Sequence, residues 1–279
     1  MSDVGDAISG ETESDRLHIG VTGGTPVFVI CSPRRRVGKT LIARLLTEFF
    51  LFDGRLATAF DTSPNDASLS HYLPDWTVPA SIGDIKSQMT LFDRLIVNDG
   101  RPKIIDLTAG LFDPFFALMR NIGFLEEAPK QSVSPVVLFV ADRHRLSAEA
   151  YQMIWRWIPG SLLVPVHNQA IMAAWHYRNF PTRRANGVPL RIPCLPWTLK
   201  SIVTKTGFSF ARFLDTPVNF PTELHEWINR SFVAFRELQL CILMESFRPL
   251  FNRACTQHDG YPGARESDDQ DERRQNSSL

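Results

Sequence analysis

Residues 27–49 read VFVICSPRRRVGKTLIARLLTEF, and this stretch decides the fold. An apolar segment, Val27–Cys31, predicts a strand that leads into Gly38-Lys39-Thr40, and a strongly apolar helix follows at once. This order of strand, loop and helix suits a nucleoside triphosphate site, because backbone N–H groups of such a loop face phosphate oxygens. Lys39 would supply a charge to the β- and γ-phosphates, and the Thr40 hydroxyl would coordinate Mg²⁺.

The beginning of the same loop departs from the usual motif. Pro33 stands where a glycine is usual, and proline has a fixed φ and no N–H to donate. Arg34, Arg35 and Arg36 follow it. A lysine at a helix start opposes the helix dipole and is a poor choice there without an anion to bind, which favours a functional Lys39 over an ordinary solvated helix end. The loop is therefore a working nucleotide site, a bent version of one, or a relic.

Short apolar runs alternate with amphipathic segments along the rest of the chain. The runs predicted as strands are Val27–Cys31, Leu56–Phe60, Lys103–Leu107, Val136–Ala141, Ser161–Val166 and Leu190–Pro193. Most of them lack a period of two, as expected for a sheet covered on both faces. The segments predicted as helices are Thr40–Phe52, Asp84–Val97, Pro114–Glu127, Ser147–Trp157, Ala170–Tyr177 and Thr222 to about Phe251. Repeated strand–helix units predict an α/β fold with a mostly parallel, doubly wound sheet flanked by helices.

Composition predicts one domain with polar ends. We expect residues 24–254 to form a single α/β domain, and residues 1–23 and 255–279 to be disordered tails because they contain few apolar groups. We expect the last helix to pack on the sheet, with a membrane-lying or partner-binding helix as the alternative. The chain has 279 residues, 44% of them hydrophobic, which is enough for one large core.

Charge and cysteine content bear on partners and compartment. The formal net charge is zero, so nothing global argues for nucleic acid or an anionic membrane. The four cysteines are scattered without metal-ligand spacing, which predicts buried free thiols in a reducing environment. No signal peptide and no bilayer-spanning run is recognisable, so we predict a cytoplasmic protein without a transmembrane segment.

Three polar residues stand at the ends of predicted strands. Asp61 ends the second strand, Asp106 the third and Asn168 the fifth. Ligands of open α/β sheets collect at the C-terminal ends of strands, so we expect these side chains on the rim that carries Lys39 and Thr40. Each has a structural alternative, because Asp106 could cap a loop, and Asp61 and Asn168 also suit turns.

The motifs around these residues resemble one family. RRRVGKT, residues 34–40, is similar to the deviant phosphate loop KGGVGKT of the ParA/MinD class of P-loop ATPases. AFDTSPN, residues 59–65, resembles the switch segment D-x-D-P-Q of that family, and KIIDLTAG, residues 103–110, resembles its Walker B strand. LRIPCLP, residues 190–196, resembles its late strand ending in Ile-Pro. The resemblance covers roughly residues 25–215 and implies a divergent P-loop NTPase-like fold of the SIMIBI class, with a degenerate Walker A loop.

The resemblance implies roles for the residues at the predicted rim. Gly38 and Lys39 would cradle the phosphates, with Lys39 also acting in catalysis at the β- and γ-phosphates. Thr40 would bind Mg²⁺, and Asp106 would hold the Mg²⁺ shell through water. Asp61 would lie near Mg²⁺ or the attacking water.

Two further positions match the family, and three more depart from it besides Pro33. Arg35 and Arg36 also replace two glycines of the family, at positions that would need a positive φ or a close approach to phosphate. Arg34 falls where the family has its signature lysine, which reaches the phosphates of the opposite subunit in an ATP-bound dimer. The resemblance therefore implies a catalytic role for Arg34, whose guanidinium would supply positive charge at the transferring phosphate. Asn168 falls where an asparagine commonly reads the adenine edge. Ser63 replaces the second switch aspartate, Asn65 replaces a glutamine, and Leu41 stands where many members have a hydroxyl. These losses favour slow turnover, or binding without turnover.

The function predicted from the sequence is ATP·Mg²⁺ binding by a slow or inactive ATPase. Its nucleotide-bound homodimer would act as a switch for positioning or assembling an unidentified protein partner. One alternative is a non-catalytic interaction protein with a decayed loop, whose arginines contact an acidic partner. Another is a small-molecule kinase, for which neither a general base nor a lid can be named. Non-specific DNA binding, which occurs among relatives, is not favoured because the chain is neutral overall.

Overall fold

A seven-stranded sheet lies at the centre of the structure, a computed structural model that describes residues 24–63, 69–159, 161–176, 178–182, 188–217 and 219–258. Its strands are β1 (Thr25–Cys31), β2 (Thr58–Asp61), β3 (Thr77–Pro79), β4 (Lys103–Asp106), β5 (Val133–Val140), β6 (Leu162–Asn168) and β7 (Leu190–Ile192). They follow the order β3-β2-β4-β1-β5-β6-β7, and every neighbouring pair is parallel. The predicted parallel α/β fold is therefore confirmed.

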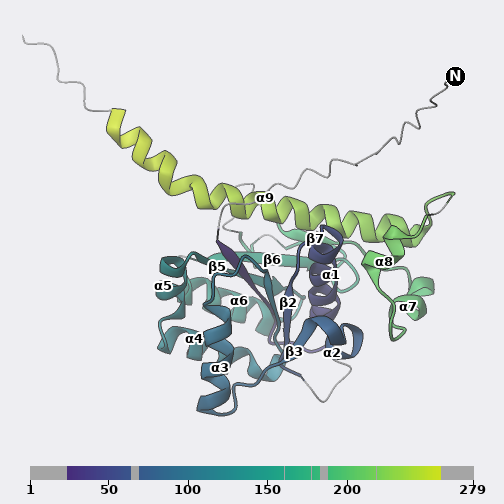
Figure 1. Ribbon diagram of the computed structural model, residues 1–279, viewed down its shortest axis with the longest axis horizontal. Helices are drawn as coiled ribbons and strands as arrows, with labels where there is room; N and C mark the ends of the chain where they lie inside the picture. Colours follow the sequence, from purple (N-terminus) through teal and green to yellow (C-terminus); the bar gives the residue numbers. More distant parts are fainter. Residues whose placement is uncertain are drawn as a thin grey trace, which may run out of the picture.

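Helices cover both faces of this sheet (Figure 1). The helices are α1 (Lys39–Phe52), α2 (Leu69–Tyr72), α3 (Ile85–Leu95), α4 (Phe112–Asn121), α5 (Phe124–Glu127), α6 (Arg145–Trp157), α7 (Trp197–Val203), α8 (Phe210–Asp215) and α9 (Glu223–His258). Three 3₁₀ turns complete the described elements: η1 (Pro74–Trp76), η2 (Ala109–Leu111) and η3 (Ala128–Gln131). Helices α1, α8 and α9 pack on one face, and α3, α4 and α6 pack on the other. Successive residues of β1 point to opposite faces, so Phe28 enters the first core and Val29 the second.

Helix α1 is buried on all sides rather than along one stripe. The sheet covers one side, while α8 and α9 cover the other. Even Arg44 and Glu48 in its middle are almost fully buried. The helix ends as predicted at Asp53-Gly54, where Gly54 has a φ of 72° and donates to the Leu51 carbonyl. A helix held in this way presents its first turn from a fixed position.

The structure differs from the predicted elements in several places. The helix predicted over Pro114–Glu127 is divided into α4 and α5 at Gly123, whose φ of 66° ends the first helix. The helix predicted over Ala170–Tyr177 is wrong for the described residues, because Asn168 closes a single turn there by accepting the Ala170, Ile171 and Met172 N–H groups. The short elements β3, α2, α7 and α8 were not predicted.

Both ends of the chain also bear on the predictions. Helix α9 runs to His258, so its last four residues fall within the segment that was predicted as a tail from residue 255. Residues 1–23 and 259–279 lie outside the described residues. The prediction that the last helix packs on the sheet is confirmed, since Trp227, Ile228 and Phe235 join the core beneath α9. None of the described helices has the length and apolar character needed to cross a membrane.

The prediction that the cysteines are buried is confirmed for two of the three whose side chains are described. Cys31 and Cys241 are buried, whereas Cys194, just after β7, is exposed. Cys255 lies where side chains are not described. Burial raises the pKa of the Cys31 thiol, so it stays protonated at the end of β1.

Candidate functional site

The loop between β1 and α1 is curled by two left-handed residues. Arg36 has a φ of 61° and Gly38 a φ of 95°. A side chain at Gly38 would also collide with Asn168, because a Cβ there would lie 2.5 Å from the Asn168 amide nitrogen. Gly38 is therefore required for both its backbone conformation and its close approach to Asn168.

The Lys39 ammonium folds back across this loop. Its Nζ donates a 2.7 Å hydrogen bond to the Arg34 carbonyl, and the residue is only 8% exposed. Burial lowers the pKa of Lys39, while the nearby Asp106 carboxylate acts in the opposite direction. The structure thus places a largely desolvated cation inside the loop, beside the first turn of α1.

Thr40 and Asp106 form a close polar pair at the rim. The Thr40 hydroxyl donates to Asp106 Oδ2 at 2.7 Å. The two residues meet because β4 lies next to β1 in the sheet, with Asp106 in register with Ile30. Asp106 is also in register with Asp61 on its other side. The pKa of Asp106 is raised to about 6, first by burial and further by the Asp61 charge, although the Thr40 hydrogen bond and Lys39 oppose this.

The donor set at this point fits Mg²⁺. A hydroxyl and a buried carboxylate are hard oxygen ligands, and Mg²⁺ is usually bound by one or two such protein groups together with phosphates and waters. Within the described residues, no cluster of three or more His, Cys, Asp or Glu side chains could hold a metal. Thr40 and Asp106 would therefore hold Mg²⁺ together with a phosphate ligand, and not as a separate protein cage.

Asp61 lies beside Asp106, but its oxygens are engaged elsewhere. Its Oδ1 accepts the Ser63 N–H at 2.9 Å. Its Oδ2 accepts the N–H and the hydroxyl of Ser70, at 3.0 and 2.8 Å. The side chain is fully buried and fixes the start of α2. In this arrangement Asp61 has a structural task, and its predicted role near Mg²⁺ or water stays a prediction.

Asn168 supports the loop from the end of β6. Its Nδ2 donates to the Val37 carbonyl at 3.0 Å, and its Oδ1 accepts the Ala170 N–H at 3.1 Å. Both ends of the amide are thus bonded to protein. That arrangement explains why this residue is buried, and its predicted role as a reader of adenine stays a prediction.

Two residues of the rim were missed by sequence reasoning. Asp142 follows β5 and accepts a hydrogen bond from Arg34 Nε at 3.3 Å. Thr62 joins two strand ends, since its hydroxyl donates to the Asp106 carbonyl and accepts the Thr108 N–H. A signal for Asp142 was present, because it stands at the end of an apolar run, as Asp61 and Asp106 do.

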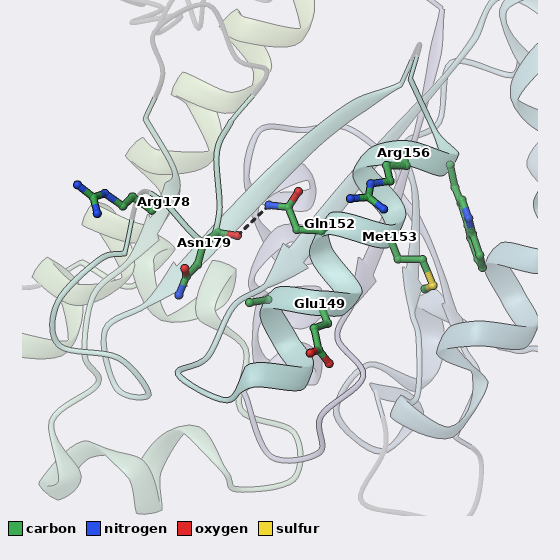
Figure 2. A pocket seen from close by; sticks show the side chains of 8 residues that line it. Glu149, Gln152, Met153, Arg156, Arg178 and Asn179 are labelled. Atoms are coloured by element: carbon green, nitrogen blue, oxygen red, sulfur yellow. Dashed lines mark hydrogen bonds between the residues drawn. The ribbon is translucent and has the colours of Figure 1, made fainter.

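Two surface pockets occur among the described residues. One, of about 500 Å³, is lined by residues of α6 together with Arg178 and Asn179. Figure 2 shows Gln152 bonded to the Asn179 carbonyl, with Arg156 and Arg178 at separate ends of this hollow. The other, of about 530 Å³, lies between β3 and α3. Neither lining includes a predicted site residue, although the second pocket contains Phe60 and Pro79, which lie next to Asp61 in the chain and in the sheet.

Comparison with known proteins gives no family assignment. The chain matches no protein-family profile, and no curated protein matches it. The case for function therefore depends on the residues of the rim.

The strain at Arg36 can be tested by substitution. We expect Arg36→Gly to raise the free energy of unfolding by about 0.5–1 kcal/mol, because glycine adopts a positive φ without the steric cost that other residues incur. Arg35→Gly is the matched control, since Arg35 lacks a positive φ, and we expect it to be neutral or destabilising. Urea unfolding of the three proteins measures both effects, and equal changes would contradict the assignment of strain.

The two possible roles of Asn168 predict different ligand profiles. If the loop binds a nucleotide, as the sequence predicts, and Asn168 supports the loop, Asn168→Ala should weaken binding of ATP, GTP and inorganic triphosphate by a similar factor, about tenfold for a lost buried hydrogen bond. A residue that reads the base would instead affect ATP alone. Titration calorimetry with the three ligands separates the outcomes, and a loss confined to ATP would contradict loop support.

Proposed function

We propose that the protein binds a nucleoside triphosphate together with Mg²⁺, with ATP as the expected nucleotide, and uses the bound state as a switch. One observation carries this proposal. The Thr40 hydroxyl lies 2.7 Å from the buried Asp106 carboxylate. The residue before Thr40 is the buried Lys39, at the start of the same helix. A cation, a hydroxyl and a carboxylate at one helix start are the groups that a magnesium–phosphate ligand requires.

Each residue has a defined task in this proposal. Lys39 would exchange its bond to the Arg34 carbonyl for bonds to phosphate oxygens. The N–H groups at the start of α1 would face the same phosphates, favoured by the helix dipole. Thr40 and Asp106 would hold Mg²⁺, which neutralises phosphate charge when bound. The repulsion between Asp106 and Asp61 supports the same assignment, because a divalent cation would relieve it.

Slow turnover, or none, fits the remaining rim residues best. Pro33 offers no N–H to a phosphate oxygen. Both oxygens of Asp61 accept hydrogen bonds from Ser63 and Ser70, so a water-positioning role would require α2 to be released. We therefore propose a binding switch whose nucleotide-bound form favours a homodimer, as the ParA/MinD resemblance implies. A protein partner would bind this nucleotide-bound form.

Titration of nucleotide into wild type and Lys39→Ala tests the proposal. We expect wild type to bind ATP with Mg²⁺, and Lys39→Ala to bind roughly 10- to 100-fold more weakly, because a charge-assisted hydrogen bond contributes about 1.5–3 kcal/mol. Lys130→Ala is the control, since that exposed lysine lies just before the start of β5, at the opposite edge of the sheet. Absence of binding by wild type at millimolar nucleotide would refute the proposal.

A further inference from the structure

The Arg34 side chain is held within its own subunit by Asp142. Its Nε donates to Asp142 Oδ2 at 3.3 Å. The Arg34 main chain is held on both sides as well, because its N–H donates weakly to Ser32 Oγ at 3.4 Å and its carbonyl accepts from Lys39. Arg34 is thus the point where the loop, the Lys39 ammonium and the end of β5 meet.

Asp142 is itself fixed in position. It follows β5, the strand beside β1, and the residue is only 7% exposed. Its Oδ1 accepts the His144 N–H at 2.8 Å, which leaves Oδ2 for Arg34. Its own N–H donates to the buried Ser147 hydroxyl. Each oxygen of the carboxylate therefore has its own partner, and Oδ2 is the one that faces the guanidinium.

The pair uses only one of the donors of Arg34. A guanidinium has five N–H donors in a rigid fork, and Asp142 is bonded to Nε. The terminal nitrogens have no bond to any described residue, and the side chain is 43% exposed. An arginine can thus contact a carboxylate through Nε and a phosphate through its terminal nitrogens at the same time, whereas a lysine offers a single ammonium.

We propose that Asp142 is a positioning residue that holds Arg34 for the terminal phosphate of a nucleotide bound in the same subunit. This inference rests on the proposed function and specifies the part of the ligand that Arg34 contacts. If Arg34 instead turned away from Asp142 to reach another subunit, the buried carboxylate would keep only its bond to the His144 N–H, which is unfavourable. The Arg34–Asp142 pair therefore selects for a triphosphate over a diphosphate without requiring a second subunit.

Calorimetry on the full chain with ATP·Mg²⁺ and ADP·Mg²⁺ tests this inference. We expect Arg34→Ala and Asp142→Asn each to weaken ATP binding about tenfold while changing ADP binding little, because one charge-assisted contact is lost. The double variant should be no weaker than Arg34→Ala, since both changes remove the same contact. Arg34→Lys should be as weak as Arg34→Ala. Arg143→Ala, which removes a neighbouring exposed arginine, should leave both affinities unchanged.

The ratio of ATP to ADP affinity separates positioning from a merely structural effect. A loss of both affinities in Asp142→Asn, or additive losses in the double variant, would overturn the inference while leaving the proposed function in place. Mixing Arg34→Ala with Lys39→Ala protein provides a second test, because an arginine acting on the opposite subunit would restore tight binding in the mixture. We expect no restoration. Failure of wild type to bind ATP would overturn both proposals.

Discussion

Replacing Glu48 by alanine is expected to lower the free energy of unfolding by about 3–5 kcal/mol, the usual cost of breaking a buried ion pair. Glu48 is fully buried in α1 and pairs with Arg44 at 3.0 Å. Its second oxygen accepts the Ser209 hydroxyl and the Ala211 N–H. Removing the carboxylate would leave a buried guanidinium and two donors without their partner, and would loosen α8 from α1.

Arg44 explains why the effect should be large. Its terminal nitrogens donate to the Val203 and Phe208 carbonyls, and its guanidinium lies over the rings of Tyr72 and Phe210. The pair thus connects α1 to α2 and to the segment between α7 and α8. In a domain of this size the change corresponds to a fall in Tm of roughly 10 °C.

Glu149→Ala is the matched control for this experiment. Glu149 pairs with Arg145 at the same four-residue spacing in α6, but both side chains are exposed. We expect a loss of no more than about 0.5 kcal/mol, because exposed helical pairs contribute little. Guanidinium chloride unfolding measures the stability of both variants. Similar losses would contradict the conclusion that the Arg44–Glu48 pair holds α1 to the neighbouring segments.

Replacing Asp106 by asparagine is expected to stabilise the protein while abolishing the effect of Mg²⁺ on nucleotide binding. The pKa of Asp106 is raised from 3.8 to about 6, mainly by burial. At about 1.4 kcal/mol per pH unit, this corresponds to a cost of about 3 kcal/mol for keeping the carboxylate charged at neutral pH. Asparagine removes that charge and can still accept the Thr40 hydrogen bond, but it is a poor Mg²⁺ ligand.

The gain in stability should depend on pH in a defined direction. Between pH 3.8 and about 6 the folded protein holds a proton on Asp106 that the unfolded chain has lost, so the free energy of unfolding falls as pH rises through this window. The advantage of Asp106→Asn should therefore be near its full value at pH 7.5 and disappear towards pH 4. Thermal unfolding across this range measures the difference, and an advantage independent of pH would contradict the assignment.

Asp61→Asn provides the matched control in the neighbouring strand. Asp61 is in register with Asp106 and equally buried, but its oxygens accept hydrogen bonds from Ser63 and Ser70. In Asp61→Asn, the amide NH₂ group would face an N–H or O–H group of Ser63 or Ser70, and two donors cannot form a hydrogen bond. We therefore expect Asp61→Asn to destabilise the protein at every pH. The same substitution at two adjacent positions should therefore have opposite signs.

The strand pattern and the strand-end residues could be predicted because they depend on local sequence. All six predicted strands are present, since continuous apolar runs are what a sheet covered on both faces requires. Asp61, Asp106 and Asn168 were expected at strand ends, and the register places the two aspartates side by side. Parallel strands end at the same edge of the sheet, so this part of the site follows from the fold class alone.

The contacts that depend on distant segments could not be predicted in the same way. Arg44 and Glu48 look like a solvent-facing pair in the sequence, and only the return of residues 203–211 over α1 buries them. Asp142 was not linked to Arg34, because the pairing requires knowledge that β5 lies next to β1. The three-residue strand β3 contains too few residues to show a hydrophobic period.

The central place of β1 also affects how the chain can fold during its synthesis. Thr25–Cys31 pairs with Lys103–Asp106 and Val133–Val140, both of which leave the ribosome long after it. At typical rates of elongation the delay is on the order of ten seconds. During that interval the newly made β1 and α1 present a long apolar surface with no flanking strands, which is a natural target for chaperones. Completion of β5 is thus the event that first encloses this segment on both sides.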